Sequence, residues 1–187
     1  VLNRAYDLGQ QQGSALFMSE ALARRSRLHW AAGQSSAARE AALAARAQAG
    51  DIIEPLRASA LALMEVLTSI ESESAPADAA LGVLESLTTR CRHPLVLARH
   101  WRAQTAVATW RGDPASALNS ARNLAMVARQ AGLLEWLCEA LTLMAQFDAT
   151  PMADDARAQA HRLAQAQGFG WLLAQLQPEG PQPQRDA

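Results

Sequence analysis

Lysine is absent from this 187-residue chain, and all 17 of its basic side chains are arginines. They stand against 18 acidic side chains, so the formal net charge of -1 offers no excess of positive charge for a polyanion. Cysteine is scarce: Cys91 and Cys138 form no CxxC pair, which favours two buried, reduced thiols. No secretory signal pattern and no apolar run near the ~20 residues of a membrane span are present. We therefore expect a cytoplasmic protein that contacts neither nucleic acid directly nor a membrane.

Residues that favour strands are also few, since isoleucine occurs only at 52, 53 and 70 and no stretch alternates apolar and polar residues. Alanine, the best helix former, is abundant. Prolines at 55, 76, 94, 114 and 151 mark helix starts, two of them behind the N-caps Asp113 and Thr150, and glycines mark helix ends. The sequence predicts antiparallel helices over 1–12, 14–32, 35–49, 53–71, 76–91, 94–111, 114–131, 133–147, 151–167 and 169–177. Residues 178–187, rich in proline and glutamine, are predicted to be a disordered tail.

An internal repeat is visible as small residues that recur at a fixed spacing. Positions +5, +9 and +12 after Gly33 hold Ala38, Ala42 and Ala45, and the same positions after Gly112 hold Ala117, Ala121 and Leu124. The frame also selects Ala80 and Ala156, which gives a period of about forty residues. Small residues at these sites allow paired helices to approach closely, so the frame predicts stacked helical hairpins.

This glycine and alanine spacing resembles the tetratricopeptide repeat over most of residues 14–167. The family places glycine, alanine, an aromatic or small residue and alanine at the positions held by Gly33, Ala38, Ala42 and Ala45. The chain departs from the family in its period, which exceeds the usual ~34 residues, and in the missing terminal proline. Similar stretched repeats occur in the sensor regions of large bacterial ATP-dependent transcriptional regulators of the maltose-activator type. The resemblance implies an all-α, right-handed solenoid of antiparallel hairpins over residues 1–177.

The resemblance also implies a ligand groove along the first helix of each hairpin. Its candidate residues are Glu20, Arg27, Trp30, Arg99, Arg102 and Thr109, with Trp110 near the end of its helix. The three arginines predict a ligand with a carboxylate or phosphate, because a guanidinium binds either group in a fork. For the tryptophans, half-buried packing is favoured over a role as an exposed anchor.

Motifs for catalysis, metal or cofactor binding are missing: the chain has no Walker loop, dinucleotide loop, nucleophile elbow or HExxH. Cys91, His93 and His100 supply only three of the four ligands of a structural zinc site, so we expect ordinary helix-end residues. Asp154 and His161 share a helix face, for which a solvated surface is favoured over an acid–base pair.

We therefore predict a non-catalytic interaction or sensor module, without a cofactor, that binds a protein, a peptide or a small acidic effector. Its expected setting is a bacterial transcriptional regulator whose DNA-binding and nucleotide-binding parts lie elsewhere in the parent chain. One alternative is a stand-alone adaptor or scaffold, with a homodimer left open. The other is a helical enzyme whose few histidines and aspartates converge in the fold.

Overall fold

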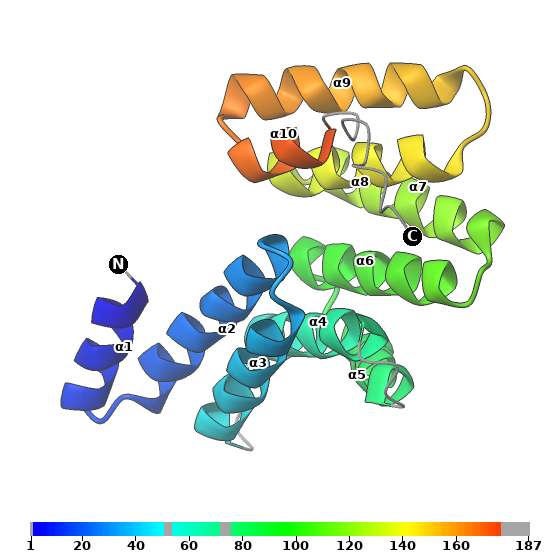
Figure 1. Cartoon of the computed structure of the whole chain (residues 1–187). Coiled ribbons are helices and arrows are strands. Elements are labelled where there is room, and N and C mark those ends of the chain that lie inside the picture. The colour runs from blue at the N-terminus through cyan, green and yellow to red at the C-terminus, as the bar shows by residue number, and fades with distance from the viewer. Residues whose placement is uncertain (1, 51–53, 72–75, 177–187) are drawn as a thin grey trace, which may run out of the picture. The chain divides into compact units, whose positions relative to one another are not determined.

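The computed structural model of the chain describes residues 2–50, 54–71 and 76–176. These residues form helices and no strand, which confirms the predicted all-α class (Figure 1). The helices are α1 (Leu2–Gln11), α2 (Ala15–Ala31), α3 (Ser35–Ala49), α4 (Pro55–Glu71), α5 (Pro76–Arg90), α6 (Pro94–Trp110), α7 (Pro114–Gln130), α8 (Leu134–Phe147), α9 (Met152–Gln167) and α10 (Gly170–Leu176). The predicted disordered tail at 178–187 lies outside the described residues.

The first and last residues of each helix lie within two residues of those predicted from the prolines, caps and glycines. Proline is the first residue of α4, α5, α6 and α7, where its missing N–H costs no intrahelical bond. Asp113 caps α7 as predicted, because its carboxylate accepts a hydrogen bond from the backbone N–H of Ser116 at 3.0 Å. The predicted cap at Thr150 is wrong: α9 begins after Pro151, and the N–H of Thr150 donates instead to the carboxylate of Asp148 at 3.0 Å.

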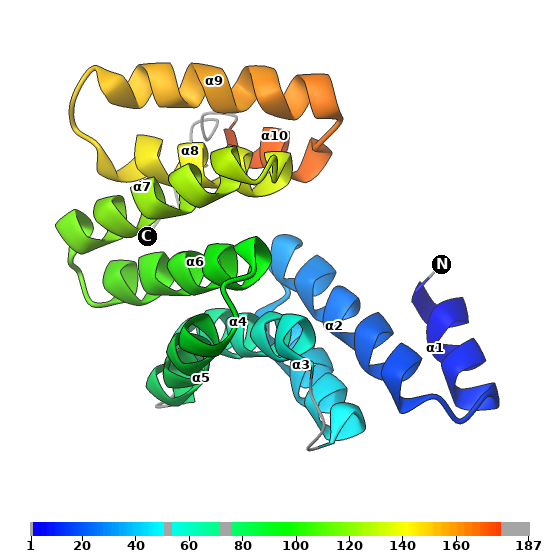
Figure 2. The same ribbon diagram turned by 180° about the vertical axis from the view of Figure 1, so that it is seen from behind.

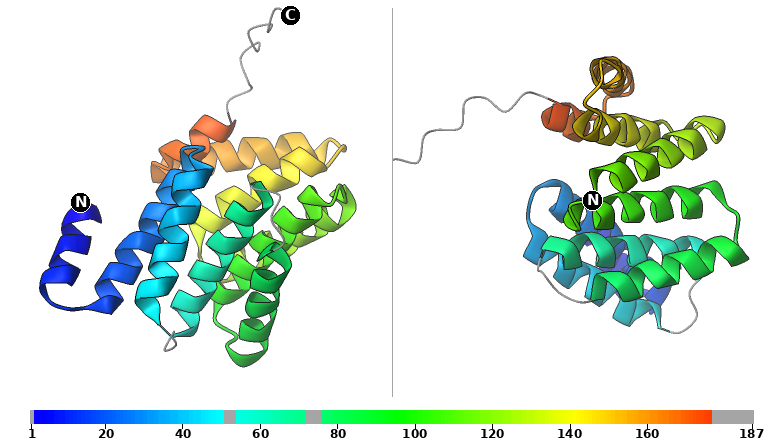
Figure 3. Two further views of the ribbon diagram at one scale, coloured as in Figure 1. Left: turned by 60° about the horizontal axis from the view of Figure 1, so that its bottom comes forward. Right: turned by 90° about the vertical axis from the view of Figure 1, so that its right-hand side faces the viewer.

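The chain divides into two compact units, Val1–Ser120 and Ala121–Ala187, and the division falls inside α7. In the first unit α2 packs against α1, α3 and α4, while α4 packs against α3, α5 and α6 (Figures 1 and 2). Each hairpin's first helix therefore contacts its own partner and the next first helix, as stacked hairpins require. In the second unit α8 packs against α9, and the short α10 contacts both (Figure 3). The right-handed solenoid stays a prediction.

The small-residue frame coincides with the core. All four anchors of the frame, at positions 38, 80, 117 and 156, are buried, and so are the residues one helical turn later, at 42, 84, 121 and 160. Seven of these eight residues are alanines, which allow the helix axes to lie close together, whereas position 84 holds a buried leucine. The repeat frame that the sequence indicated thus selects positions that are buried where helices pack.

Two small polar groups in the core are satisfied by backbone carbonyls. Ser26, which stands where the repeat would place an apolar residue, is fully buried and donates its hydroxyl to the Ala38 carbonyl at 2.7 Å. Cys138 donates its thiol to the Ala160 carbonyl at 3.3 Å. Cys138 is a buried free thiol as predicted, whereas Cys91, also a free thiol, is only half-buried.

Among the described helices, none is both long enough and apolar enough to cross a membrane.

Candidate functional site

The predicted groove residues of α2 and α6 meet inside the first unit. The guanidinium carbon of Arg102 lies 5.3 Å from the ring centroid of Trp30, a cation–π contact between the two helices. Arg102 is buried and Trp30 is half-buried, so this pair lies mostly inside the packing of the unit. Half-buried packing, the role favoured for Trp30 from the sequence, is confirmed.

Arg99 ties α6 to α4. Its Nη1 donates to the Leu56 carbonyl at 2.5 Å and to the hydroxyl of Ser59 at 2.9 Å. Burial, together with the positive charge of Arg27, lowers the pKa of Arg99 to about 10, while Glu20 opposes this shift. Arg99 therefore keeps its charge at neutral pH.

Five of the seven predicted groove residues thus form one cluster at α2, α4 and α6: Glu20, Arg27, Trp30, Arg99 and Arg102. The remaining two lie at the far end of α6. Thr109 is ten residues beyond Arg99, which corresponds to ~15 Å along the helix axis, and its hydroxyl donates to the Thr105 carbonyl at 2.7 Å. Trp110 is 47% exposed, so it is less buried than its packing role predicted. The structure does not bring these two residues to the cluster.

The residues considered for metal or acid–base chemistry lie at ordinary structural positions. His93 is the N-cap of α6, where its Nδ1 accepts from the Leu95 N–H at 3.2 Å. His100 is buried with its ring against Trp101, at 5.0 Å between centroids. Asp154 pairs with Arg157 on an exposed face of α9. Among the residues that the structure describes, no group of three or more His, Cys, Asp or Glu side chains is placed to hold a metal ion.

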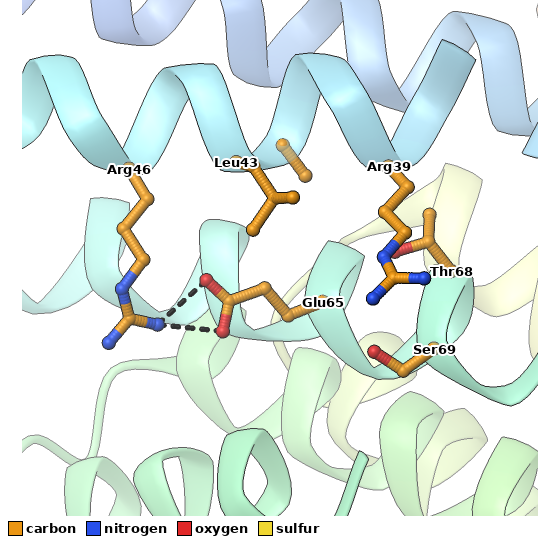
Figure 4. Close-up of a pocket in the computed structure, with 7 residues that line it drawn as sticks. Arg39, Leu43, Arg46, Glu65, Thr68 and Ser69 are labelled. Atoms are coloured by element: carbon orange, nitrogen blue, oxygen red, sulfur yellow. Dashed lines mark hydrogen bonds and ion pairs between the residues drawn. The ribbon is translucent and has the colours of Figure 1, made fainter. Parts of the chain in front are cut away.

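A pocket of about 200 Å³ lies between α3 and α4 (Figure 4). From α3 it is lined by Arg39, Ala42, Leu43 and Arg46, and from α4 by Glu65, Thr68 and Ser69. The Arg46 Nη1 donates to both carboxylate oxygens of Glu65 at 2.7 Å, and Figure 4 shows the Arg39 guanidinium directed at Thr68 and Ser69. Leu43 lies between the two arginines and is 54% exposed.

The second unit holds a pocket of the same type, of about 350 Å³, between the second half of α7 and α8. Its lining includes Arg122, Ala125, Met126 and Arg129 from α7 and Met144 from α8. Arg122 is bound to Asp148, at the end of α8, at 3.2 Å. Hydrogen bonds from Thr150, together with Arg122, keep the pKa of Asp148 below its ordinary value, so this ion pair persists at neutral pH.

Both pockets are built on the same eight-residue pattern, Arg-x-x-Ala-Leu/Met-x-Ala-Arg. It occupies residues 39–46 in α3 and 122–129 in α7. This pattern was not predicted, because the glycine-based frame aligns α3 with α7 in a register that differs from the pattern's by four residues, about one helical turn. A search for identical spacings of arginine and alanine within the alanine-rich helices would have found it.

Burial divides the pattern into two sets of positions. Its two fixed alanine positions, at 42 and 45 in α3 and at 125 and 128 in α7, are buried in both copies. The Leu/Met position is about half exposed in both, at 54% for Leu43 and 51% for Met126. Helix packing therefore accounts for the alanines, and one arginine of each copy pairs with a carboxylate of the neighbouring helix or its end, Arg46 with Glu65 and Arg122 with Asp148. Neither kind of contact accounts for the exposed apolar residue.

Comparison with known proteins found no matching family model, no matching curated protein and no matching solved structure.

Proposed function

We propose that this chain is a non-catalytic, helical-repeat binding module that recognises a protein partner through arginine-flanked pockets on its helices. The observation that carries the proposal is the exposed half of the repeated pattern. An apolar side chain between two arginines recurs at the surface of both units, at positions where core packing does not demand it. Arginine is enriched among the residues that contribute most to protein–protein binding, and a partner that covers the neighbouring apolar side chain removes it from water.

The tetratricopeptide-like, right-handed solenoid is the arrangement that we propose for the complete array of hairpins. It is supported by the burial of the alanine frame and by the contacts from each hairpin's first helix to the next in the first unit. Such arrays expose long helical faces while their cores need only neighbouring hairpins, so binding surfaces can vary without loss of the fold.

We further propose that the module is the sensor or interaction region of a bacterial transcriptional regulator of the maltose-activator type. The alanine-rich hairpins of about forty residues support this proposal. It predicts a parent polypeptide that also carries DNA-binding and ATP-binding segments. A parent without such segments would leave the stand-alone adaptor, and the binding proposal would be unaffected.

Site-specific crosslinking tests whether the pockets bind a partner. A photoreactive benzoylphenylalanine is placed at position 43 or 126 in the full-length protein, in the cells that naturally produce it. The matched control places it at Met152, which is 65% exposed and belongs to neither pocket. The captured protein is then purified and its affinity for the unlabelled chain is measured by calorimetry.

We expect one partner to be captured from position 43 or 126 and not from 152, with an affinity that falls when Leu43 or Met126 is replaced by serine. Equal capture from all three positions, or a captured protein that shows no saturable binding when purified, contradicts the proposed function.

A further inference from the structure

We infer that each pocket binds an acidic peptide segment in which two carboxylates flank an apolar side chain. This inference rests on the proposed function and gives the ligand class for the same two surfaces, α3–α4 and α7–α8. The partner supplies an extended segment of the form acid-x-apolar-x-acid. Its two carboxylates pair with the two arginines of the pattern, and its apolar side chain contacts Leu43 or Met126.

The spacing along the helix selects this arrangement. The arginines of each copy are seven residues apart, which places their Cα atoms about 10 Å apart along one helix face. The Leu/Met residue stands four residues after the first arginine, between the two. In an extended peptide, side chains two and four residues apart point to the same side, and four residues span about 13 Å. Because arginine side chains are long, they cover the difference between these two lengths.

The charge of the linings favours an acidic ligand. The α3–α4 pocket has two arginines against one carboxylate, that of Glu65. The α7–α8 pocket has Arg122 and Arg129, with Asp148 bound to the first. In each pocket the ion pair orients one guanidinium, and the bond from Arg46 to Glu65 uses a single nitrogen of a group that carries five N–H donors. One oriented arginine and one further arginine therefore face the segment in each unit.

The apolar centre distinguishes a peptide from a small anion. An inorganic phosphate is only a few ångströms wide, so it contacts one arginine of a pair separated by ~10 Å and leaves Leu43 or Met126 in water. A segment with an apolar residue between two acids covers all three groups together. Methionine adapts its shape to such contacts, which suits the second copy of the pattern.

The test follows methionine methyl groups in the intact chain by NMR. The chain has five methionines, and two of them, Met126 and Met144, line the α7–α8 pocket. The conservative variant Leu43→Met adds a reporter in the α3–α4 pocket. The probe is the peptide Ser-Glu-Ser-Leu-Ser-Glu-Ser. One control peptide carries glutamine in place of both glutamates, and another carries serine in place of leucine.

We expect a saturable shift of the Met126 and Met144 methyl signals and of the new signal in Leu43→Met, with no shift of Met18 or Met152. The glutamine peptide should bind at least about tenfold more weakly than the acidic peptide. Added salt should lower the affinity of the acidic peptide, because it screens the attraction between the charges. Arg129→Ala should weaken binding at the α7–α8 pocket about three- to tenfold, and Arg39→Ala should do the same at the α3–α4 pocket. Arg162→Ala and Arg92→Ala, exposed arginines outside both pockets, should leave the affinities unchanged.

Three results would overturn the inference. One is equal binding of the glutamate and glutamine peptides. Another is a saturable shift at Met18 or Met152 in place of the pocket methyl groups. The third is a saturable Met126 shift with sodium phosphate or citrate that the peptide does not displace, which would assign the pocket to a small acidic effector. If crosslinking from position 43 or 126 captures a partner that binds through a segment without acidic residues, the inference fails and the proposed function stands. If neither crosslinking nor the peptide gives a specific result, both fail.

Discussion

The substitution Ala38→Leu probes the alanine frame on which the hairpin packing depends. Ala38 has no exposed surface, and its carbonyl accepts the hydrogen bond from the buried Ser26 of α2. A leucine at this site adds three carbon atoms where α2 already lies in contact with α3. Overpacking of this kind costs about 1–3 kcal/mol. For a chain of this length that corresponds to a fall in Tm of roughly 2–12 °C.

The matched control is Ala47→Leu on the same helix, because Ala47 is exposed and the chemical change is identical. Here the cost should stay within about 0.5 kcal/mol, since alanine and leucine have similar helix propensities and no neighbour is displaced. Urea unfolding followed by circular dichroism gives the free energy of unfolding of each variant. Equal losses at positions 38 and 47, or no loss at 38, would show that α2 and α3 do not meet at the alanine frame.

Three further predictions concern buried groups. Burial raises the pKa of Cys138 to about 11. At pH 8 a thiol reagent should therefore modify the half-buried Cys91 in the native protein and should modify Cys138 only after denaturant is added. Rapid reaction of both thiols in the native protein would contradict the structure. Burial lowers the pKa of His100 below its ordinary value of 6.5, so the His100 imidazole binds a proton more tightly in the unfolded chain than in the folded one. The folded state therefore has its full stability above pH 6.5 and loses stability as the pH falls. The Tm should therefore drop between pH 7.5 and pH 5, and His100→Leu should flatten that drop; an unchanged slope would exclude His100 as its source. Arg102→Met and Trp30→Leu, combined in a double-mutant cycle, should show a coupling energy of about 0.5–2 kcal/mol in urea unfolding, and additive effects would mean that the cation–π contact contributes nothing.

The amino-acid sequence by itself determined the helices and the positions at which they pack. Helices α4 to α7 begin at a proline, and glycines follow several helix ends. Both residues act on the backbone conformation of the few residues around them, so the helix boundaries could be predicted without knowledge of the fold. The buried stripe through Ala38 and its counterparts could also be predicted, because residues three or four apart in the sequence lie on the same face of a helix. Thr150 is the local exception, since a carboxylate two residues earlier binds its N–H.

Only the tertiary structure decided which faces of these helices pack against other helices of the same unit and which faces stay exposed. Two of the predicted groove residues show this: Arg99 donates to the carbonyl of Leu56, 43 residues away, and Arg102 lies buried over Trp30. The arginines and the Leu/Met residue of the repeated pattern line a pocket in each unit, but no functional role was predicted for them from the sequence. The physical reason is the same in both cases. The exposure of a side chain depends on what packs beside it from distant parts of the chain, whereas helix formation and its termination depend on a few neighbouring residues.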